Sequence, residues 1–337
     1  MNFVSLEQRM ASMYIDMFPQ FLPDDHAAIS IAEQERFYHF MKSLYQLAFD
    51  QPLLFVPSLH EDDFYPRRFN KASYGKPELQ VNMQKFIKSM DALLQNMYQA
   101  GQGAKVSFNK KQQAVLQQLG VDVSSDLPEA WKWMAVHPEA NLTAFSFCFF
   151  KPDHSYASDI YAHLLGQEAF EKLTNWMLSQ GYKRFDLYSE TPSAAKVSVV
   201  YANPQWNDED IKSGFTMKIK HTGIAAEYHY AASRPPIFGL CIPGGLKTFL
   251  EHFDDAQMQV QKLIIDHTKR CDNCRYCVQT DKTGLRPLAC MPIRYEGNEY
   301  RLCPYYPGFS YCWTHIDNEL ADQLIAMLSF MDQFIPR

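Results

Sequence analysis

Six of the eight cysteines of this chain fall between Cys271 and Cys312, and three of them stand in the run RCDNCRYC at residues 270–277. A local thiol cluster in a chain of 337 residues is more typical of a bound metal than of a disulfide framework, which small secreted domains use. On an α-helix, side chains at positions i and i+6 diverge by roughly 120°, so three ligands with this spacing cannot meet on one ion. The cluster therefore predicts a loop that binds a metal through cysteine side chains.

The segment MPIRYEGNEYRLCP, residues 291–304, alternates apolar and charged residues on either side of Gly297-Asn298, which predicts a β-hairpin with a turn at these two residues. The expected cross-strand pairs are Tyr295 with Tyr300, Ile293 with Leu302, Arg294 with Arg301, and Glu296 with Glu299. This register places Pro292 opposite Cys303, with Cys290 just beyond. The hairpin thus returns a fourth thiol toward the cluster.

Four ligands are predicted, namely Cys271, Cys274, Cys277 and Cys303. An all-cysteine site of this kind is closed and tetrahedral when it holds zinc in a structural role, which is the reading that we favour. Zinc knuckles usually use two Cys-x2-Cys pairs, however, and the second pair is missing here. Cys290, Cys312, His267 and His315 flank the region and remain further possible ligands.

An iron-sulfur centre is the alternative cofactor. Cys-x2-Cys-x2-Cys followed by Cys303-Pro304 resembles the ferredoxin run of bacteria, in which the fourth cysteine also precedes a proline. The resemblance is incomplete, since Cys277 and Cys303 lie far apart and no second cluster motif is present. A third reading has no metal, with the thiols free or joined as disulfides.

The periodicity of apolar residues indicates an α+β chain in three parts. Residues 1–120 read as a helical region, with one helix over 28–50 and another over 77–101 that ends at Gly101. Residues 121–262 read as an α+β domain with a largely antiparallel sheet, and residues 263–337 as a Cys-rich metal-binding module with a closing helix at 317–334. The strands expected in the middle part are 141–150, 182–190, 195–203, 215–221, 224–230 and 235–242, with a helix over 158–181.

Composition excludes several classes of function. The net charge of −6 is the wrong sign for a protein that grips phosphate backbones, so no nucleic-acid partner is expected. No run of apolar residues is long enough for a membrane span, and the first residues do not resemble a signal peptide, which favours the cytoplasm. Nucleotide-binding loops and hydrolase motifs are missing as well.

The stretches CDNCRYCVQTDKTGLRP and LCPYYPGF, with the Trp-Thr pair before the last helix, resemble uncharacterised Cys-rich cytoplasmic proteins of Gram-positive, often anaerobic, bacteria. Such proteins have no established activity, so the resemblance implies a bacterial cytoplasmic setting and no substrate. The expected function is therefore metal binding through a structural zinc, together with a small-molecule ligand or a protein partner. An iron-sulfur redox protein or electron carrier, and an enzyme with an unrecognised site in the middle domain, remain alternatives, so whether the protein is an enzyme stays open.

Overall fold

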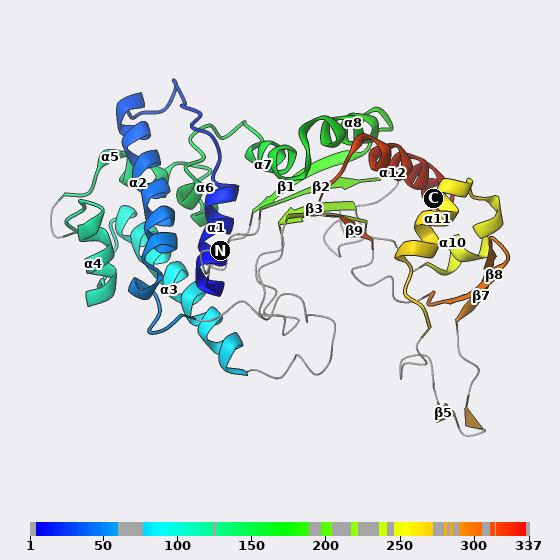
Figure 1. The fold of residues 1–337 in the computed structure, drawn as a ribbon. Coiled ribbons are helices and arrows are strands. Elements are labelled where there is room, and N and C mark those ends of the chain that lie inside the picture. Colours follow the sequence, from blue (N-terminus) through cyan, green and yellow to red (C-terminus); the bar gives the residue numbers. More distant parts are fainter. Residues whose placement is uncertain are drawn as a thin grey trace. The chain divides into compact units, whose positions relative to one another are not determined.

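The structure is a computed structural model that describes residues 5–59, 77–123, 126–188, 197–203, 217–221, 236–240, 246–271, 280–281, 284–285, 290–304, 311–313 and 315–334. The chain divides into two compact units (Figure 1). Unit 1 comprises residues 1–160, 186–198 and 221–236, and unit 2 comprises residues 161–185, 199–220 and 237–337. The predicted division at residues 120 and 262 stays a prediction.

Unit 1 is built mainly from helices. They are α1 (Leu6–Met17), α2 (Ile31–Asp50), η1 (Pro52–Leu54), α3 (Pro77–Gly101), α4 (Lys110–Gln118), α5 (Glu129–Val136) and α6 (Leu142–Phe147), and α7 (Tyr156–Leu165) leads the chain into unit 2. The predicted helices over 28–50 and 77–101 are confirmed as α2 and α3. Apolar stripes on these helices supply the core, since residues three or four apart in a helix share one face.

Close packing between α3 and α5 explains the position of Gly101. A Cβ atom at Gly101 would lie 2.7 Å from the Cβ of Ala135, so only glycine allows the two helices to approach this closely. The indole Nε1 of Trp131, which is fully buried, donates a hydrogen bond of 2.7 Å to the carbonyl oxygen of Met97. The helix ends at Gly101 as predicted, but the left-handed conformation that follows a helix belongs to Gly103, with φ +82°.

The strand predicted over 141–150 is wrong, because residues 142–147 form α6. Asn141 caps this helix, with its side-chain oxygen accepting a hydrogen bond from the backbone N–H of Ala144. Every residue of α6 is buried, including the polar residues Thr143 and Ser146, so the helix has no face exposed to solvent. A short apolar run of this kind has no period that separates a buried helix from a buried strand.

A carboxyl group is buried in unit 1 without full hydrogen bonding. Asp91 on α3 is 8% exposed, and among the described residues its Oδ1 atom has no hydrogen-bond partner. Burial raises the pKa of Asp91 from 3.8 to about 7. The nearby ring of Tyr14 stacks on Tyr45, with centroids 5.1 Å apart, so the surroundings are largely aromatic.

The raised pKa predicts that the stability of unit 1 falls as the pH rises. Between pH 4 and 7 the unfolded chain has lost the proton of Asp91 while the folded chain retains it, so increasing pH favours unfolding. Asp91→Asn removes this titration and should raise the free energy of unfolding by about 3 kcal/mol more at pH 8 than at pH 5. Urea denaturation followed by circular dichroism at both pH values measures the difference. Asp126→Asn is the matched control, because this side chain is 91% exposed, and an equal effect of Asp91→Asn at both pH values would refute the prediction.

Unit 2 contains most of the sheet. Its helical elements are α8 (Gln167–Ser179), α10 (Lys247–Glu251), η5 (Phe253–Asp255), α11 (Met258–His267), α12 (Asn318–Met331) and η6 (Asp332–Phe334). The strands are β1 (Lys183–Tyr188), β2 (Val197–Ala202), β3 (Met217–His221), β4 (Pro236–Gly239), β5 (Thr280–Asp281), β6 (Gly284–Leu285), β7 (Met291–Tyr295), β8 (Asn298–Leu302) and β9 (Cys312–Trp313). The C-terminal ends of β1 and β3 and the N-terminal ends of β2 and β4 belong to unit 1.

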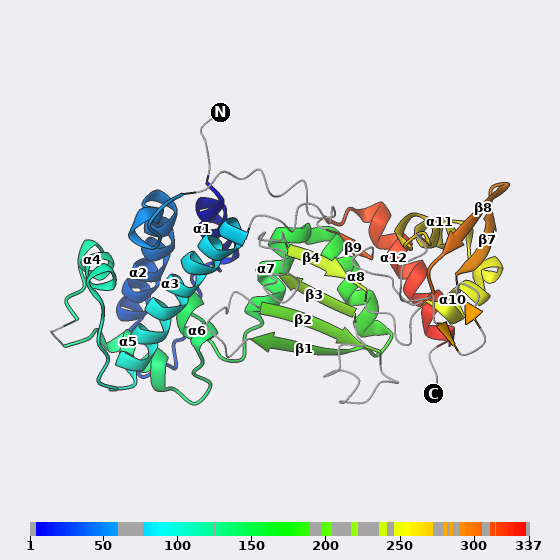
Figure 2. The same cartoon turned by 90° about the horizontal axis from the view of Figure 1, so that it is seen from below.

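The main sheet has the order β1-β2-β3-β4-β9, and the arrows of β1 to β4 alternate in direction (Figure 2). Strand β9 pairs with β4 in antiparallel orientation, with Gly239 opposite Cys312. Helix α8 covers one face of the sheet, and α12 packs along α8 (Figures 1 and 2). The predicted mixture of helices and antiparallel strands is therefore confirmed. The strand predicted over 224–230 lies outside the described residues.

The helix predicted over 158–181 is interrupted at Gly166, which has φ +114°. A Cβ atom at this position would lie 2.9 Å from the carbonyl oxygen of Ile316. The backbone N–H of Ile316 also donates a hydrogen bond of 2.9 Å to the carbonyl oxygen of Leu165. The break thus lets the segment before α12 lie directly on the start of α8.

Asp332 connects the C-terminal end of α12 to the sheet. Its carboxylate accepts hydrogen bonds from the Tyr182 hydroxyl, at 2.7 and 2.8 Å, and from the Asn203 amide, at 2.7 Å. Tyr182 directly precedes β1 and Asn203 directly follows β2, so one side chain ties the last helix to two strands. Burial raises the pKa of Asp332, although both hydrogen bonds act in the opposite direction.

Candidate functional site

The hairpin predicted in the Cys-rich region is present as β7 and β8, but its register differs from the expected one. Met291 lies opposite Leu302, Ile293 opposite Tyr300, Arg294 opposite Glu299, and Tyr295 opposite Asn298. The turn is therefore Glu296-Gly297, one residue earlier than predicted, and both residues have positive φ, at 48° and 76°. The predicted pairing of Arg294 with Arg301 and of Glu296 with Glu299 is wrong, because the actual register pairs opposite charges.

The shift amounts to two residues, so each side chain keeps its predicted face. Its main consequence lies at the open end of the hairpin. Pro292 lies opposite Arg301 and not, as predicted, opposite Cys303. Continuing the observed register by one residue places Cys290 opposite Cys303.

A third segment pairs with the hairpin along β8. Arg270 forms an antiparallel bridge with Leu302. The backbone N–H of Cys271 donates to the carbonyl oxygen of Arg301 at 2.8 Å, and the N–H of Cys303 donates to that of Lys269 at 2.9 Å. Residues 269–271 are therefore held as a short outer strand, directly after α11.

This pairing gathers three cysteines on one face. In antiparallel strands, opposite residues point to the same face and successive residues to opposite faces. Cys271 and Arg301 thus share a face with Cys303, and the register adds Cys290 to it. Cys303 is 6% exposed, whereas Cys271 and Cys290 are half-buried.

The Arg301 side chain supports this arrangement. Its Nη2 atom donates a hydrogen bond of 3.2 Å to the sulfur of Cys290. This hydrogen bond and the charge of Cys290, followed by the charge of Cys271, raise the pKa of Arg301. One guanidinium therefore stands beside two of the thiols.

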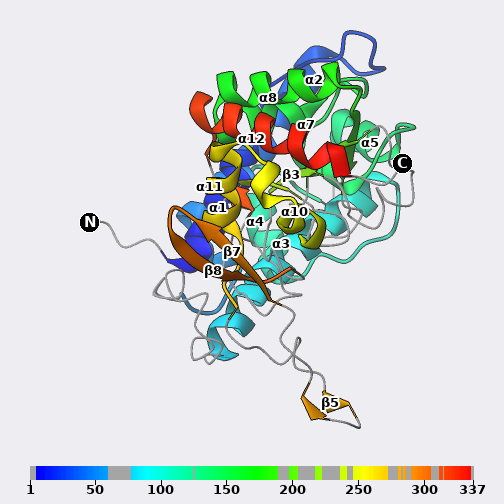
Figure 3. The same cartoon turned by 90° about the vertical axis from the view of Figure 1, so that its right-hand side faces the viewer.

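Opposite this face, apolar and aromatic contacts fix the hairpin. Leu302 and Ile293 are buried, and the Arg270 guanidinium lies over the ring of Tyr300 at 4.1 Å from its centroid. Phe253 of η5 meets Tyr295 edge to face at 6.2 Å. Figure 3 shows the hairpin beside α10 and α11, which provide this packing surface.

Of the four predicted metal ligands, the structure brings Cys271 and Cys303 to the same face. Cys274 and Cys277 lie outside the described residues. Within the described part of the chain, no group of three or more histidine, cysteine or acidic residues is placed to hold a metal ion. The predicted four-cysteine site is thus neither built nor refuted by the described residues.

The other possible ligands lie elsewhere in unit 2. Cys312 belongs to β9 in the main sheet. His267 ends α11, and its ring lies 4.9 Å from that of Trp313. His315 lies beside Gly166, at the start of α8. Cys290 is therefore the further cysteine that the hairpin places nearest to Cys303 in register.

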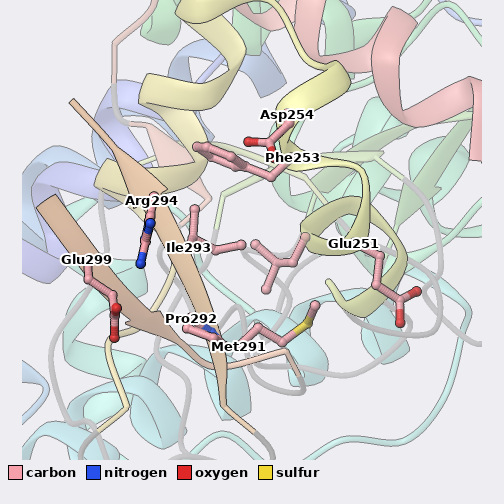
Figure 4. Close-up of a pocket in the computed structure, with 9 residues that line it drawn as sticks. Glu251, Phe253, Asp254, Met291, Pro292, Ile293, Arg294 and Glu299 are labelled. Atoms are coloured by element: carbon pink, nitrogen blue, oxygen red, sulfur yellow. The ribbon is translucent and has the colours of Figure 1, made fainter. Parts of the chain in front are cut away.

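A groove of about 470 Å³ runs between β7 and the α10–η5 segment (Figure 4). Its floor contains the buried side chains Leu250, Phe253 and Ile293. Its rim carries charged and exposed side chains, namely Glu251, Asp254, Arg294 and Glu299. The volume is in the range of ligand-binding pockets, and the lining combines a small apolar floor with a larger polar, charged rim that is open to solvent.

Sequence reasoning missed this groove and the contact between Arg301 and Cys290. The acidic run EHFDD at residues 251–255 was a local signal for the rim. Its position against β7 depends on packing between segments about forty residues apart, which no local pattern encodes.

No family model, curated protein or solved structure matches this chain. No helix in the described ranges has the length and apolar character that crossing a membrane requires. The functional argument therefore depends on the chain's own residues.

The hairpin turn predicts a stabilising substitution. Glu296 adopts φ 48°, which is unfavourable for a glutamate and favourable for asparagine in a type I′ turn. Glu296→Asn should therefore raise the free energy of unfolding by roughly 0.5–1 kcal/mol. Thermal and urea denaturation check the change.

Gly297→Ala is the opposing variant. A Cβ atom at Gly297 would meet no atom within 4 Å, so any loss of stability comes from its φ of 76° alone. This variant should lose about 1 kcal/mol. If Gly297→Ala is neutral, the turn does not have the conformation described.

Proposed function

We propose that the protein is a metal-binding protein in which Cys271, Cys274, Cys277 and Cys303 hold a structural zinc ion. We further propose that the hairpin of β7 and β8, which the zinc would fix in place, serves as a binding surface. The observation that carries the proposal is the pairing of residues 269–271 with β8. It places the first and last of the four thiols on one face before any metal is considered. A cytoplasmic setting is part of the same proposal.

The geometry suits a closed zinc site. In a tetrahedral site with Zn–S bonds of about 2.3 Å, neighbouring sulfur atoms lie roughly 4 Å apart. Cys271 and Cys303 occupy diagonal positions on adjacent strands, within the range that side chains bridge. Cys274 and Cys277 follow Cys271 by three and six residues, so a short loop suffices to bring them back.

The surrounding charge also fits. Four thiolates and one Zn²⁺ ion carry a net charge of −2, which nearby cations offset. Lys269 and Arg301 share the face of the two thiols, and Arg301 already donates to a cysteine sulfur. Cationic donors to the sulfurs around a metal adjust its charge and hold its ligands in place.

When bound, zinc would supply a covalent link between residues 271–277 and the end of β8. Its binding energy adds directly to folding. The hairpin and the α10–η5 segment would then form the binding surface. The hairpin presents its outer strand, and α10 with η5 presents the opposite wall of the groove.

An iron-sulfur centre is the second candidate, supported by the Cys-x2-Cys-x2-Cys spacing and by Cys303-Pro304. It would make the cluster the redox-active part of the protein. Elemental analysis and an optical spectrum of protein purified without oxygen distinguish the two. About one zinc per chain with no visible band supports the first candidate, whereas iron and sulfide in matched amounts support the second.

Substitution of the ligands is the direct test. Cys303→Ser and Cys274→Ser should each lose most of the bound metal, and the thermal stability of unit 2 should fall because the metal is linked to folding. Cys148→Ala is the matched control, because this buried cysteine lies in unit 1 and should leave the metal content unchanged. Cys290→Ser establishes whether the thiol opposite Cys303 belongs to the ligand set. Full metal content with full stability in both Cys303→Ser and Cys274→Ser would refute the proposal.

A further inference from the structure

The outer edge of β7 has backbone groups that no strand satisfies within the described residues. Antiparallel partners alternate between hydrogen-bonded and non-bonded pairs. Arg301 and Cys303 direct their backbone groups to residues 269–271, so Leu302 directs its own toward β7. Met291, opposite Leu302, and Ile293, opposite Tyr300, therefore direct their backbone groups toward β8. The backbone groups of Pro292 and Arg294 point the other way, to the outer edge of β7.

Three hydrogen-bonding groups are available at this edge. They are the carbonyl oxygen of Pro292 and both the N–H and the carbonyl oxygen of Arg294. The proline ring removes the fourth, which is a common feature of edge strands. The edge can therefore pair with a short extended segment but is poorly suited to an extended sheet.

The groove beyond this edge is acidic. The carboxylate of Asp254 has no hydrogen-bond or ion-pair partner in the described part of the chain. Glu251 contacts Lys247 at 3.5 Å, but both side chains are about half exposed, so the pair contributes little. Arg294 lies opposite Glu299, which offsets its charge. Among the charged residues that line the groove, the one left without a close partner in the described part of the chain is Asp254, and its negative charge lies on the wall formed by α10 and η5.

We propose that this groove binds an extended, basic peptide segment of a partner protein, which adds as a strand to the outer edge of β7. The inference rests on the proposed function to the extent that the metal fixes the hairpin. Main-chain hydrogen bonds give such strand addition its affinity, and the side chains of alternate residues give it specificity.

The geometry assigns the two faces of the bound peptide. A peptide residue opposite Arg294 shares the open, charged face of the hairpin. Its neighbours point to the opposite face, which is the side of β7 where Ile293 lines the groove together with residues of α10 (Figure 4). A lysine there lays its aliphatic stem on the apolar floor and brings its ammonium group to Asp254 and Glu251.

The same charges argue against a second copy of this chain as the occupant. The chain carries a net charge of −6, and two acidic grooves would repel each other. The edge also presents Arg294 and Pro292, residue types that discourage pairing between identical strands.

The first experiment uses the protein as purified, with its metal content measured, and the acetylated and amidated probe Lys-Thr-Lys-Thr-Lys-Thr-Lys in calorimetry. Saturable binding with one peptide per chain is expected, and the same peptide with Glu in place of Lys should not bind. N-methylation of the threonine amides, which point toward β7, should weaken binding about tenfold or more, whereas N-methylation of the lysine amides should be tolerated. Equal effects of the two methylation patterns would overturn strand addition.

The second experiment tests the groove. Glu251→Gln with Asp254→Asn should weaken binding of the lysine probe about threefold to tenfold. Glu168→Gln with Glu171→Gln is the matched control, since it also removes two exposed carboxylates, but from α8. An equal loss in both double variants would indicate non-specific attraction and overturn the proposal.

Two further outcomes separate this inference from the proposed function. Metal-loaded protein that does not bind the probe refutes the peptide site and leaves the metal site standing. Protein without metal that binds the probe with the expected methylation pattern supports the peptide site and contradicts the zinc. Dimerisation in sedimentation experiments that the groove double variant abolishes would identify a second copy as the occupant and overturn the inference.

Discussion

Two backbone hydrogen bonds, between Cys271 and Arg301 and between Cys303 and Lys269, hold the Cys-rich region in its arrangement. They join the end of α11 to β8, the second strand of the hairpin. Each contributes modestly to stability, because folding exchanges it for a bond to water. Their larger effect is directional, since they decide which side chains share a face. The thiols, Arg301 and the free edge of β7 all take their orientation from this one register.

Periodicity predicted much of the fold correctly. The helices over 28–50 and 77–101 and the strands β1 to β4 appear where alternation of apolar residues placed them. Two errors have a common origin. Residues 142–147 and the helix break at Gly166 depend on what surrounds them, namely complete burial in one case and close approach of Ile316 in the other. Local pattern contains no information about either neighbour.

For the candidate site, the sequence predicted the hairpin and its two faces, but not its register. Gly297-Asn298 looked like the turn because both residues tolerate positive φ, whereas the structure uses Glu296-Gly297. A choice between these turns depends on the pairing of Arg294 with Glu299 and on the packing of Tyr295 against Phe253. The groove was beyond prediction for the same reason, since its two walls are distant in sequence.

The hydrogen bonds of Asp332 span 150 residues to Tyr182 and 129 residues to Asn203. A ribosome synthesises β1 and β2 long before it synthesises α12. The Asp332 carboxylate, which accepts hydrogen bonds from the residues next to these two strands, is therefore added late. Contacts among α1 to α6, such as the hydrogen bond from the Tyr45 hydroxyl to the carbonyl oxygen of Ser146, 101 residues away, need no residue beyond α6. The helical unit can therefore fold while the sheet still waits for its last helix, and the unfinished sheet is the part of the nascent chain most in need of protection by chaperones.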